Sequence, residues 1–108
     1  MLYEVREYTA VPGKLPALIR RFKDHTLGLF EKHGMDVELM TLTEFGENST
    51  NELVYIMRWD SYEEMQERWA TFVSNPDWQA VKQESEVDGP LVAQVRRRLL
   101  NTAAFDSA

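Results

Sequence analysis

Hydrophobic and polar positions alternate with a two-residue period at the start of the chain, which predicts a β-strand over Leu2–Tyr8. Tyr3 and Val5 fall on one face of this strand, and Glu4, Arg6 and Tyr8 fall on the other. A strand flanked by helices is expected inside a sheet. The polar row therefore either meets water or lines a cavity in which it faces a ligand.

The period becomes helical after the Pro12-Gly13 turn, which predicts a helix over residues 14–33. Pro16 suits the first helical turn, and Gly34 is typical of the left-handed residue that ends a helix. His33 lies where a basic side chain favours the negative end of the helix.

Two further strands are expected over Val37–Phe45 and Glu52–Trp59, joined by a polar loop. The second of them is apolar on both sides: Leu53, Tyr55, Met57 and Trp59 share one face, while Val54 and Ile56 share the other. A strand of this kind should be central and covered on both faces.

The remaining segments predict two helical runs and a last strand. Asp60 and Ser61 precede a helix in which Glu64 completes a capping box. The Asn75-Pro76 pair ends that helix and begins another helical run, and Leu91–Leu100 is expected to be the fourth strand.

The resulting order is β-α-β-β-α-β, which predicts one α+β domain over residues 1–108 with a ferredoxin-like fold. Right-handed crossovers place strands one and three in the middle of a four-stranded antiparallel sheet, with both helices on one face. The second, apolar face then needs a cover, and packing against a second copy of the chain would supply it. A homodimer is therefore expected.

Composition excludes several classes of function. The net charge of −6 argues against binding nucleic acid or an anionic membrane. With no cysteine, the chain has no disulfide, thiolate nucleophile or cysteine-based metal site. We expect a cytoplasmic protein, because there is no signal-like start and no run of about 20 apolar residues.

Several short motifs resemble the NIPSNAP family: the opening strand, Pro12-Gly13-Lys14, residues 31–34, the Arg58-Trp59 strand end, and residues 75–80. The Leu99-Leu100…Phe105 tail is similar too, although Asp106-Ser107 replaces the usual Ser-Pro-like ending. The resemblance implies a dimeric α/β-barrel with helices outside and a cavity in each half. It also implies relatives among cofactor-free monooxygenases, haem-handling enzymes and stress-responsive barrels. The family's own biochemistry is mostly unassigned.

The candidate ligand-binding residues are Glu4, Arg6, Tyr8, Tyr55 and Trp59. In the functional interpretation Arg6 anchors an anion, Tyr8 donates a hydrogen bond, and Tyr55 and Trp59 stack on a small organic molecule. In the structural interpretation Arg6 pairs with Glu4 as an internal bridge and the aromatic rings are core. The first interpretation predicts a small-molecule-binding protein, with an enzymatic role left open; the second predicts a non-enzymatic homodimeric scaffold with a filled core.

Other residues carry weaker signals. His25 is either a general base or a histidine at the edge of the helical stripe, and the second interpretation is favoured. Alternation sends Arg96 and Arg98 to one face and Arg97 to the other, so at most two of them can share a pocket. The favoured interpretation is an edge strand protected by charge, or salt bridges to the acidic excess. Trp69, Phe72 and Trp78 are expected to pack the helices. No metal, cofactor or catalytic motif is indicated.

Overall fold

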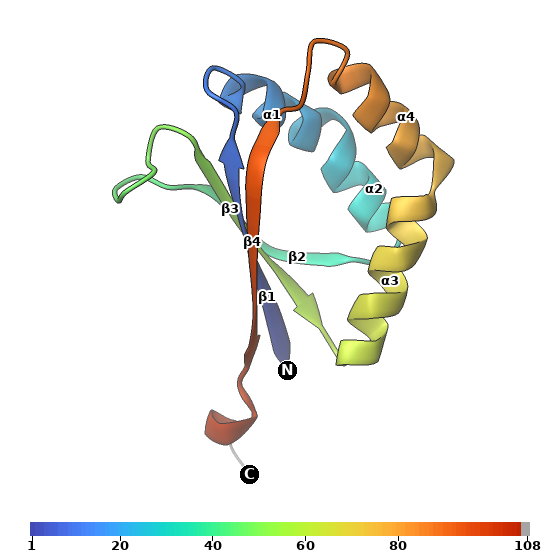
Figure 1. Ribbon diagram of the computed structural model, residues 1–108. Coiled ribbons are helices and arrows are strands. Elements are labelled where there is room, and N and C mark those ends of the chain that lie inside the picture. The colour runs from blue at the N-terminus through green and yellow to red at the C-terminus, as the bar shows by residue number, and fades with distance from the viewer. Residues whose placement is uncertain (107–108) are drawn as a thin grey trace.

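The fold is a single antiparallel sheet with helices on one of its faces. The computed structural model describes residues 1–106, so Ser107 of the expected tail lies outside the described residues. Strands β1 (Leu2–Ala10), β2 (Asp36–Leu42), β3 (Glu52–Trp59) and β4 (Val92–Asn101) pair in the order β2-β3-β1-β4 (Figure 1). The expected ferredoxin-like arrangement, with strands one and three in the centre, is confirmed.

The helices also follow the expected order. The first helical stretch comprises α1 (Leu15–Arg21), a π-helical segment (Phe22–Thr26) and α2 (Leu27–Lys32). The second comprises α3 (Tyr62–Ser74) and α4 (Pro76–Ser85), and a short 3₁₀ turn follows β4.

A π-helical segment interrupts the first helix, which the periodicity of the sequence did not indicate. The backbone N–H of Leu27 donates to the carbonyl of Phe22, five residues back, where an α-helix would use the residue four back. Thr26 is buried beside this segment, and its hydroxyl donates to the carbonyl of Arg21 over 3.3 Å. This local competition for backbone carbonyls accompanies the wider turn.

Side-chain caps define the second pair of helices. The hydroxyl of Ser61 accepts from the backbone N–H of Glu64 over 3.1 Å, and Glu64 accepts in return from the N–H of Asp60. Asn75 ends α3 in an extended conformation, and its side chain accepts from the N–H of Asp77 at the start of α4. The predicted Ser61 cap and Asn-Pro boundary are confirmed, while the side chain of Glu64 meets the N–H one residue before the one that a capping box uses.

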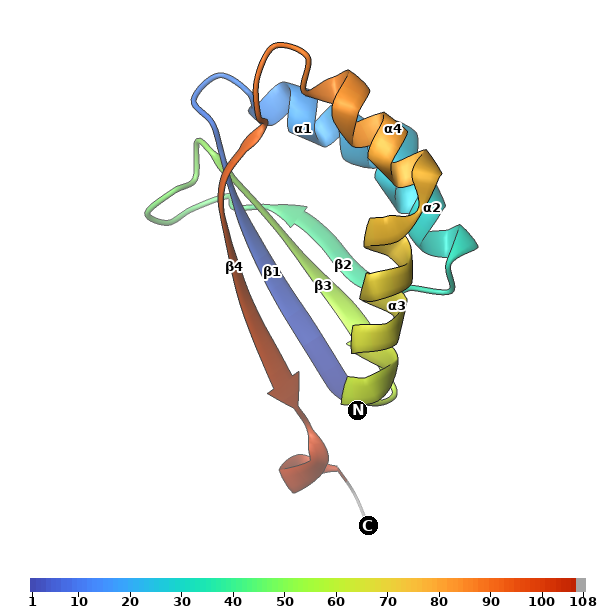
Figure 2. The ribbon, with the colours of Figure 1, turned by 45° about the vertical axis from the view of Figure 1, so that its right-hand side comes forward.

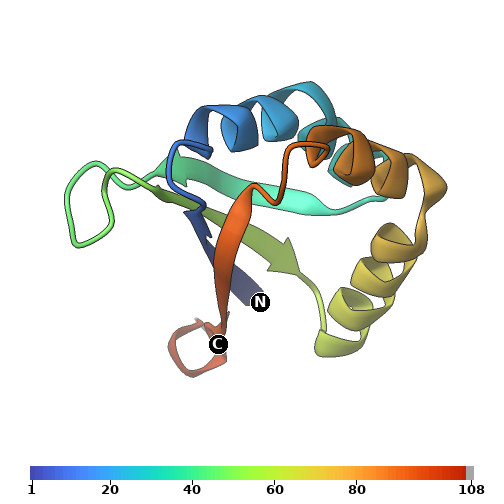
Figure 3. The ribbon, with the colours of Figure 1, turned by 45° about the horizontal axis from the view of Figure 1, so that its top comes forward.

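The two faces of the sheet have different surroundings. Leu53, Tyr55, Met57 and Trp59 of β3 are buried between the sheet and the helices. Figures 2 and 3 show all the longer helices on that one side. No element among residues 1–106 covers the opposite face, which carries Val54 and Ile56.

The strand ends differ slightly from the expected ones. β2 ends at Leu42, because β3 begins at Glu52 and offers no partner to the residues beyond Thr43. Phe45, expected in this strand, is 95% exposed in the connecting loop. β4 spans Val92–Asn101, one residue later than expected.

Candidate functional site

The polar row of β1 lies beneath the chain's own helices. Arg6 lies opposite Tyr55 in the pairing of β1 with β3, and residues opposite each other in a sheet point to the same face. Glu4, Arg6 and Tyr8 therefore share the helix-covered face with Tyr55 and the other buried residues of β3. Of the two expected surroundings for this row, water is excluded for its first residue, since Glu4 is 1% exposed.

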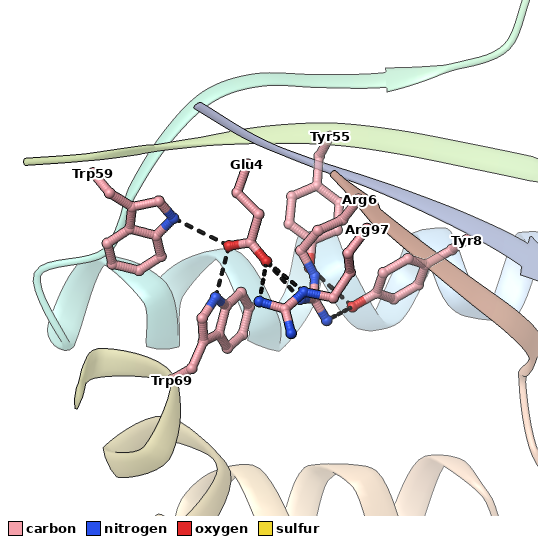
Figure 4. Close-up of polar contacts among 7 residues, drawn as sticks. All are labelled: Glu4, Arg6, Tyr8, Tyr55, Trp59, Trp69 and Arg97. Carbon is pink, nitrogen blue, oxygen red and sulfur yellow. Dashed lines mark hydrogen bonds and ion pairs between the residues drawn. The ribbon is translucent and has the colours of Figure 1, made fainter. Parts of the chain in front are cut away.

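The carboxylate of Glu4 is the centre of a hydrogen-bonded network (Figure 4). Its Oε1 accepts from the indole N–H groups of Trp59 over 3.1 Å and Trp69 over 2.7 Å. Its Oε2 accepts from Nη1 of Arg6 over 3.0 Å and Nε of Arg97 over 2.7 Å. One side chain thus joins three strands and α3.

The guanidinium of Arg6 extends the network toward two phenols. Its Nε donates to the hydroxyl of Tyr55 over 2.9 Å, and its Nη2 donates to the hydroxyl of Tyr8 over 3.1 Å. Its central carbon lies 4.3 Å from the ring centroid of Trp69, a cation–π distance. The internal Arg6–Glu4 bridge of the structural interpretation is therefore present.

The structure brings all five candidate residues together and adds two that were assigned elsewhere. Trp69 was expected only to pack the helix, and Arg97 either to protect an edge strand or to form a salt bridge, which it does with Glu4 over 2.7 Å. Arg97 lies opposite Arg6 on the helix-covered face, and its side chain is about half exposed (49%). The alternation of β4, which separates Arg97 from Arg96 and Arg98, was the signal that could have identified it. A long-range indole hydrogen bond such as that of Trp69 leaves no signal of its own in the sequence.

The network shifts the ionisation of its members. Burial alone would raise the pKa of Glu4, but the Trp69 hydrogen bond and the charges of Arg6 and Arg97 outweigh it and lower that pKa. Burial opposes the charge of Arg6, yet the oxygens of Tyr55, Tyr8 and Glu4 raise its pKa above the ordinary value. Burial, followed by the neighbouring Tyr8, raises the pKa of Tyr55.

The two phenols leave one hydroxyl hydrogen without a partner in the network. Their oxygens are 2.9 Å apart, so one donates to the other. Tyr55 is fully buried, and Tyr8 offers the one acceptor that its hydroxyl meets among the described residues. Tyr55 must therefore donate to Tyr8, because a buried donor is rarely left unpaired. The hydroxyl hydrogen of Tyr8 is then free to point away from the network.

A pocket of about 350 Å³ begins at Tyr8 and lies between β4 and α4. Val92 and Val95 of β4 form one wall, and Trp78 and Lys82 of α4 form another. A wider hollow of about 790 Å³ separates α2 from α4, but it is open and lined mostly by exposed side chains. The smaller pocket is the better candidate, because a buried polar network adjoins it.

The two histidines lie apart from this site. His25 is exposed on the first helical stretch, which does not support a role as general base in the network. Nδ1 of His33 bonds to the carbonyl of Leu29, and its Nε2 meets the amide of Asn75. Residues 1–106 contain no group of three or more ligating side chains suited to a metal.

No helix in the described part is long and apolar enough to cross a membrane.

We expect Glu4→Gln to lower the free energy of unfolding by about 3 kcal/mol, because it leaves two guanidinium groups facing an uncharged amide in a buried setting. The matched control is Glu67→Gln, which changes an exposed carboxylate on α3 that forms no ion pair within residues 1–106. It should cost at most about 0.5 kcal/mol. Urea unfolding of the three proteins measures both values, and equal losses would show that the network does not hold the fold.

The stability difference between wild type and Glu4→Gln should depend on pH. The pKa of Glu4 is lower in the folded chain than its ordinary value of 4.5, so its ionised form stabilises the fold. That contribution is complete above the ordinary value and is lost as the pH falls through the lowered one. The difference in unfolding free energy between wild type and Glu4→Gln should therefore shrink below about pH 4.5. A difference that stays constant from pH 7 to pH 3 would contradict the assigned ionisation.

Several solved structures share this fold. A protein of Agrobacterium tumefaciens has a crystal structure similar to this chain at a TM-score of 0.82 and 25% identity, covering 97% of this chain and 96% of that one. An uncharacterized NIPSNAP domain protein from Burkholderia xenovorans matches at 0.81 and 22% identity over 100% of both chains. A protein of Pseudomonas aeruginosa, at 0.56 and 16% identity over 92% and 90%, shares the fold alone.

Comparison with curated protein sequences gives no significant match. The family model described as NIPSNAP matches residues 3–106, which is nearly the whole chain. Together with the ferredoxin-like sheet and the similar crystal structures, this match leads to one conclusion: the chain belongs to the NIPSNAP family.

Proposed function

We propose that this NIPSNAP protein binds a small organic molecule in the pocket between β4 and α4. The observation that carries the proposal is the position of Tyr8, which belongs to the buried hydrogen-bonded network and also lines a pocket of about 350 Å³. Known ligand pockets of about 300–1,000 Å³ combine apolar walls with a few polar groups that fix orientation. Val92, Val95 and Trp78 supply the apolar walls here.

In the proposed arrangement Arg6 does not contact the ligand but holds Tyr8 in place at the pocket. Three of its nitrogens already donate to Glu4, Tyr55 and Tyr8, and its plane stacks on Trp69. Arg6 is therefore a positioning residue that fixes the phenol of Tyr8, and the phenol makes the contact with the ligand. Such support from a second layer of side chains is what a precise binding site requires.

The alternative is a structural role, in which the protein is a homodimeric scaffold that binds no small molecule. The observation in its favour is the saturation of Glu4, whose two oxygens together accept from four side chains. A network of that kind is sufficient as a cross-link between β1, β3, β4 and α3. The scaffold predicts an unoccupied pocket and no response to ligands, which distinguishes it from the binding proposal.

We further propose that two copies pack through the open face of the sheet. Val54 and Ile56 lie at the centre of that face, where no described element covers them. Charged side chains lie toward the edges of this face: Arg98 of β4 pairs with Glu7, and Asp36 of β2 pairs with Arg58. A two-fold arrangement would set the apolar centres of the two copies against each other inside this charged rim.

The binding proposal predicts a loss of ligand response when the pocket is filled. Val95→Trp places a large ring in the pocket, whereas Val87→Trp adds the same ring at a position that is 77% exposed and does not line it. A broad small-molecule panel, read by melting temperature and tryptophan fluorescence, should give binders to wild type and Val87→Trp. Val95→Trp should not respond to them. The scaffold alternative is supported if no compound raises the melting temperature of wild type.

The dimer proposal predicts that a charge on the open face separates the copies. Val54→Asp should sediment as a single chain of 12.6 kDa, because an unpaired carboxylate would be buried between two sheets. The control, Val73→Asp, lies on the exposed surface of α3 and should sediment like wild type as a pair. A well-folded wild type that sediments as a single chain at micromolar concentration would disprove the dimer.

A further inference from the structure

The pocket between β4 and α4 ends at a buried arginine that the Glu4 network does not use. Arg21 is the last residue of α1, and its side chain is 5% exposed. Its Nη1 donates to Glu86 over 2.9 Å and to the hydroxyl of Ser85 over 3.2 Å. Its central carbon lies 5.3 Å from the ring centroid of Trp78. These contacts fix the guanidinium against a wall of the pocket.

One buried donor of this guanidinium has no protein acceptor. Nε of Arg21 is buried and makes no hydrogen bond with any residue of the described range 1–106. Buried donors are paired in the great majority of proteins, and an unpaired one costs free energy. The planar fork of arginine suits a carboxylate, which accepts from two of its nitrogens at once.

A second cation lies on the same side of the pocket. Lys82 follows Trp78 by four residues, so both side chains project from the same side of α4, and both line the pocket. Arg21 and Lys82 face one carboxylate there, that of Glu86, which leaves an excess of positive charge. This local excess is found in a chain with a net charge of −6, so it is not a consequence of composition.

Apart from Gln94, the rest of the pocket lining is mostly apolar. Tyr8 and Trp78 contribute aromatic rings, and Val92 and Val95 contribute branched side chains. An aromatic ring or a similar flat apolar body would bury its faces against these groups. The charged and apolar parts of the wall therefore suit the two parts of one amphipathic molecule.

We propose that the ligand of this pocket is an organic carboxylate with a flat apolar body, and that its carboxylate is held by Arg21 and Lys82. This inference rests on the proposed binding function and adds the charge and shape of the ligand to it. The apolar body lies against Trp78 and Val95, and the hydroxyl of Tyr8 donates to a polar group of the ligand.

The experiment compares 2-naphthoate with its neutral amide, 2-naphthamide, on the full chain. Titrations followed by ¹⁵N-resolved indole signals and by tryptophan fluorescence should show naphthoate perturbing Trp78. We expect naphthoate to bind about tenfold more tightly than naphthamide, as one charge-assisted contact contributes about a factor of ten. Its affinity should fall as the salt concentration rises.

A substitution of Lys82 tests the assigned charge without disturbing a buried group. Lys82→Gln should weaken naphthoate several-fold and leave naphthamide unchanged. The control, Lys32→Gln, removes an exposed charge on α2 outside this pocket and should change neither. Arg21→Lys should also weaken naphthoate, because it keeps the charge and loses the fork; if that variant fails to fold, the Lys82 pair decides.

Two results would overturn the inference, and they are separable from a failure of the proposed function. If naphthamide binds as tightly as naphthoate, the pocket binds small molecules but does not select carboxylates. If neither probe perturbs Trp78, the carboxylate inference is wrong. The proposed binding function is disproved as well only if no compound of the broad panel raises the melting temperature of wild type.

Discussion

The structure depends on one buried carboxylate. Glu4 lies on a central strand, is 1% exposed, and accepts hydrogen bonds from two indoles and two guanidinium groups. Burying a charge is costly unless partners compensate it, and here the partners come from β1, β3, β4 and α3. The cost of leaving Glu4 unpaired thus requires these elements to assemble together.

This constraint also determines where the chain can offer a site. Glu4 orients Arg6, Arg6 orients the phenols of Tyr8 and Tyr55, and the buried Tyr55 turns the hydroxyl hydrogen of Tyr8 outward. The pocket between β4 and α4 begins where that chain of hydrogen bonds ends. The same network can therefore cross-link the strands at Glu4 and position the phenol of Tyr8 at the pocket.

The two faces of the sheet differ in what they carry. The face under the helices holds the buried network and the pocket, both of which are formed within a single chain. The opposite face has apolar residues at its centre and charges of opposite sign toward its edges. Interfaces commonly place an apolar centre inside a polar rim, which is why this face suits a second copy of the chain.

The sequence by itself determined the elements, their order and the fold class. Period-two and helical patterns, the Ser61 cap and the Asn75-Pro76 boundary are local signals, and local signals are sufficient for these features. It also brought Glu4, Arg6, Tyr8, Tyr55 and Trp59 into one group, because alternation places side chains on a definite face.

Only the tertiary structure decided what that face meets. Trp69 and Arg97 reach Glu4 from positions 65 and 93 residues away, and Arg21 meets Glu86 across 65, so their roles depend on packing between elements. The π-helical turn at Phe22–Thr26 left no clear signal for a related reason: its hydrogen bond reaches five residues back instead of four, and the spacing of apolar residues hardly changes over a single such turn.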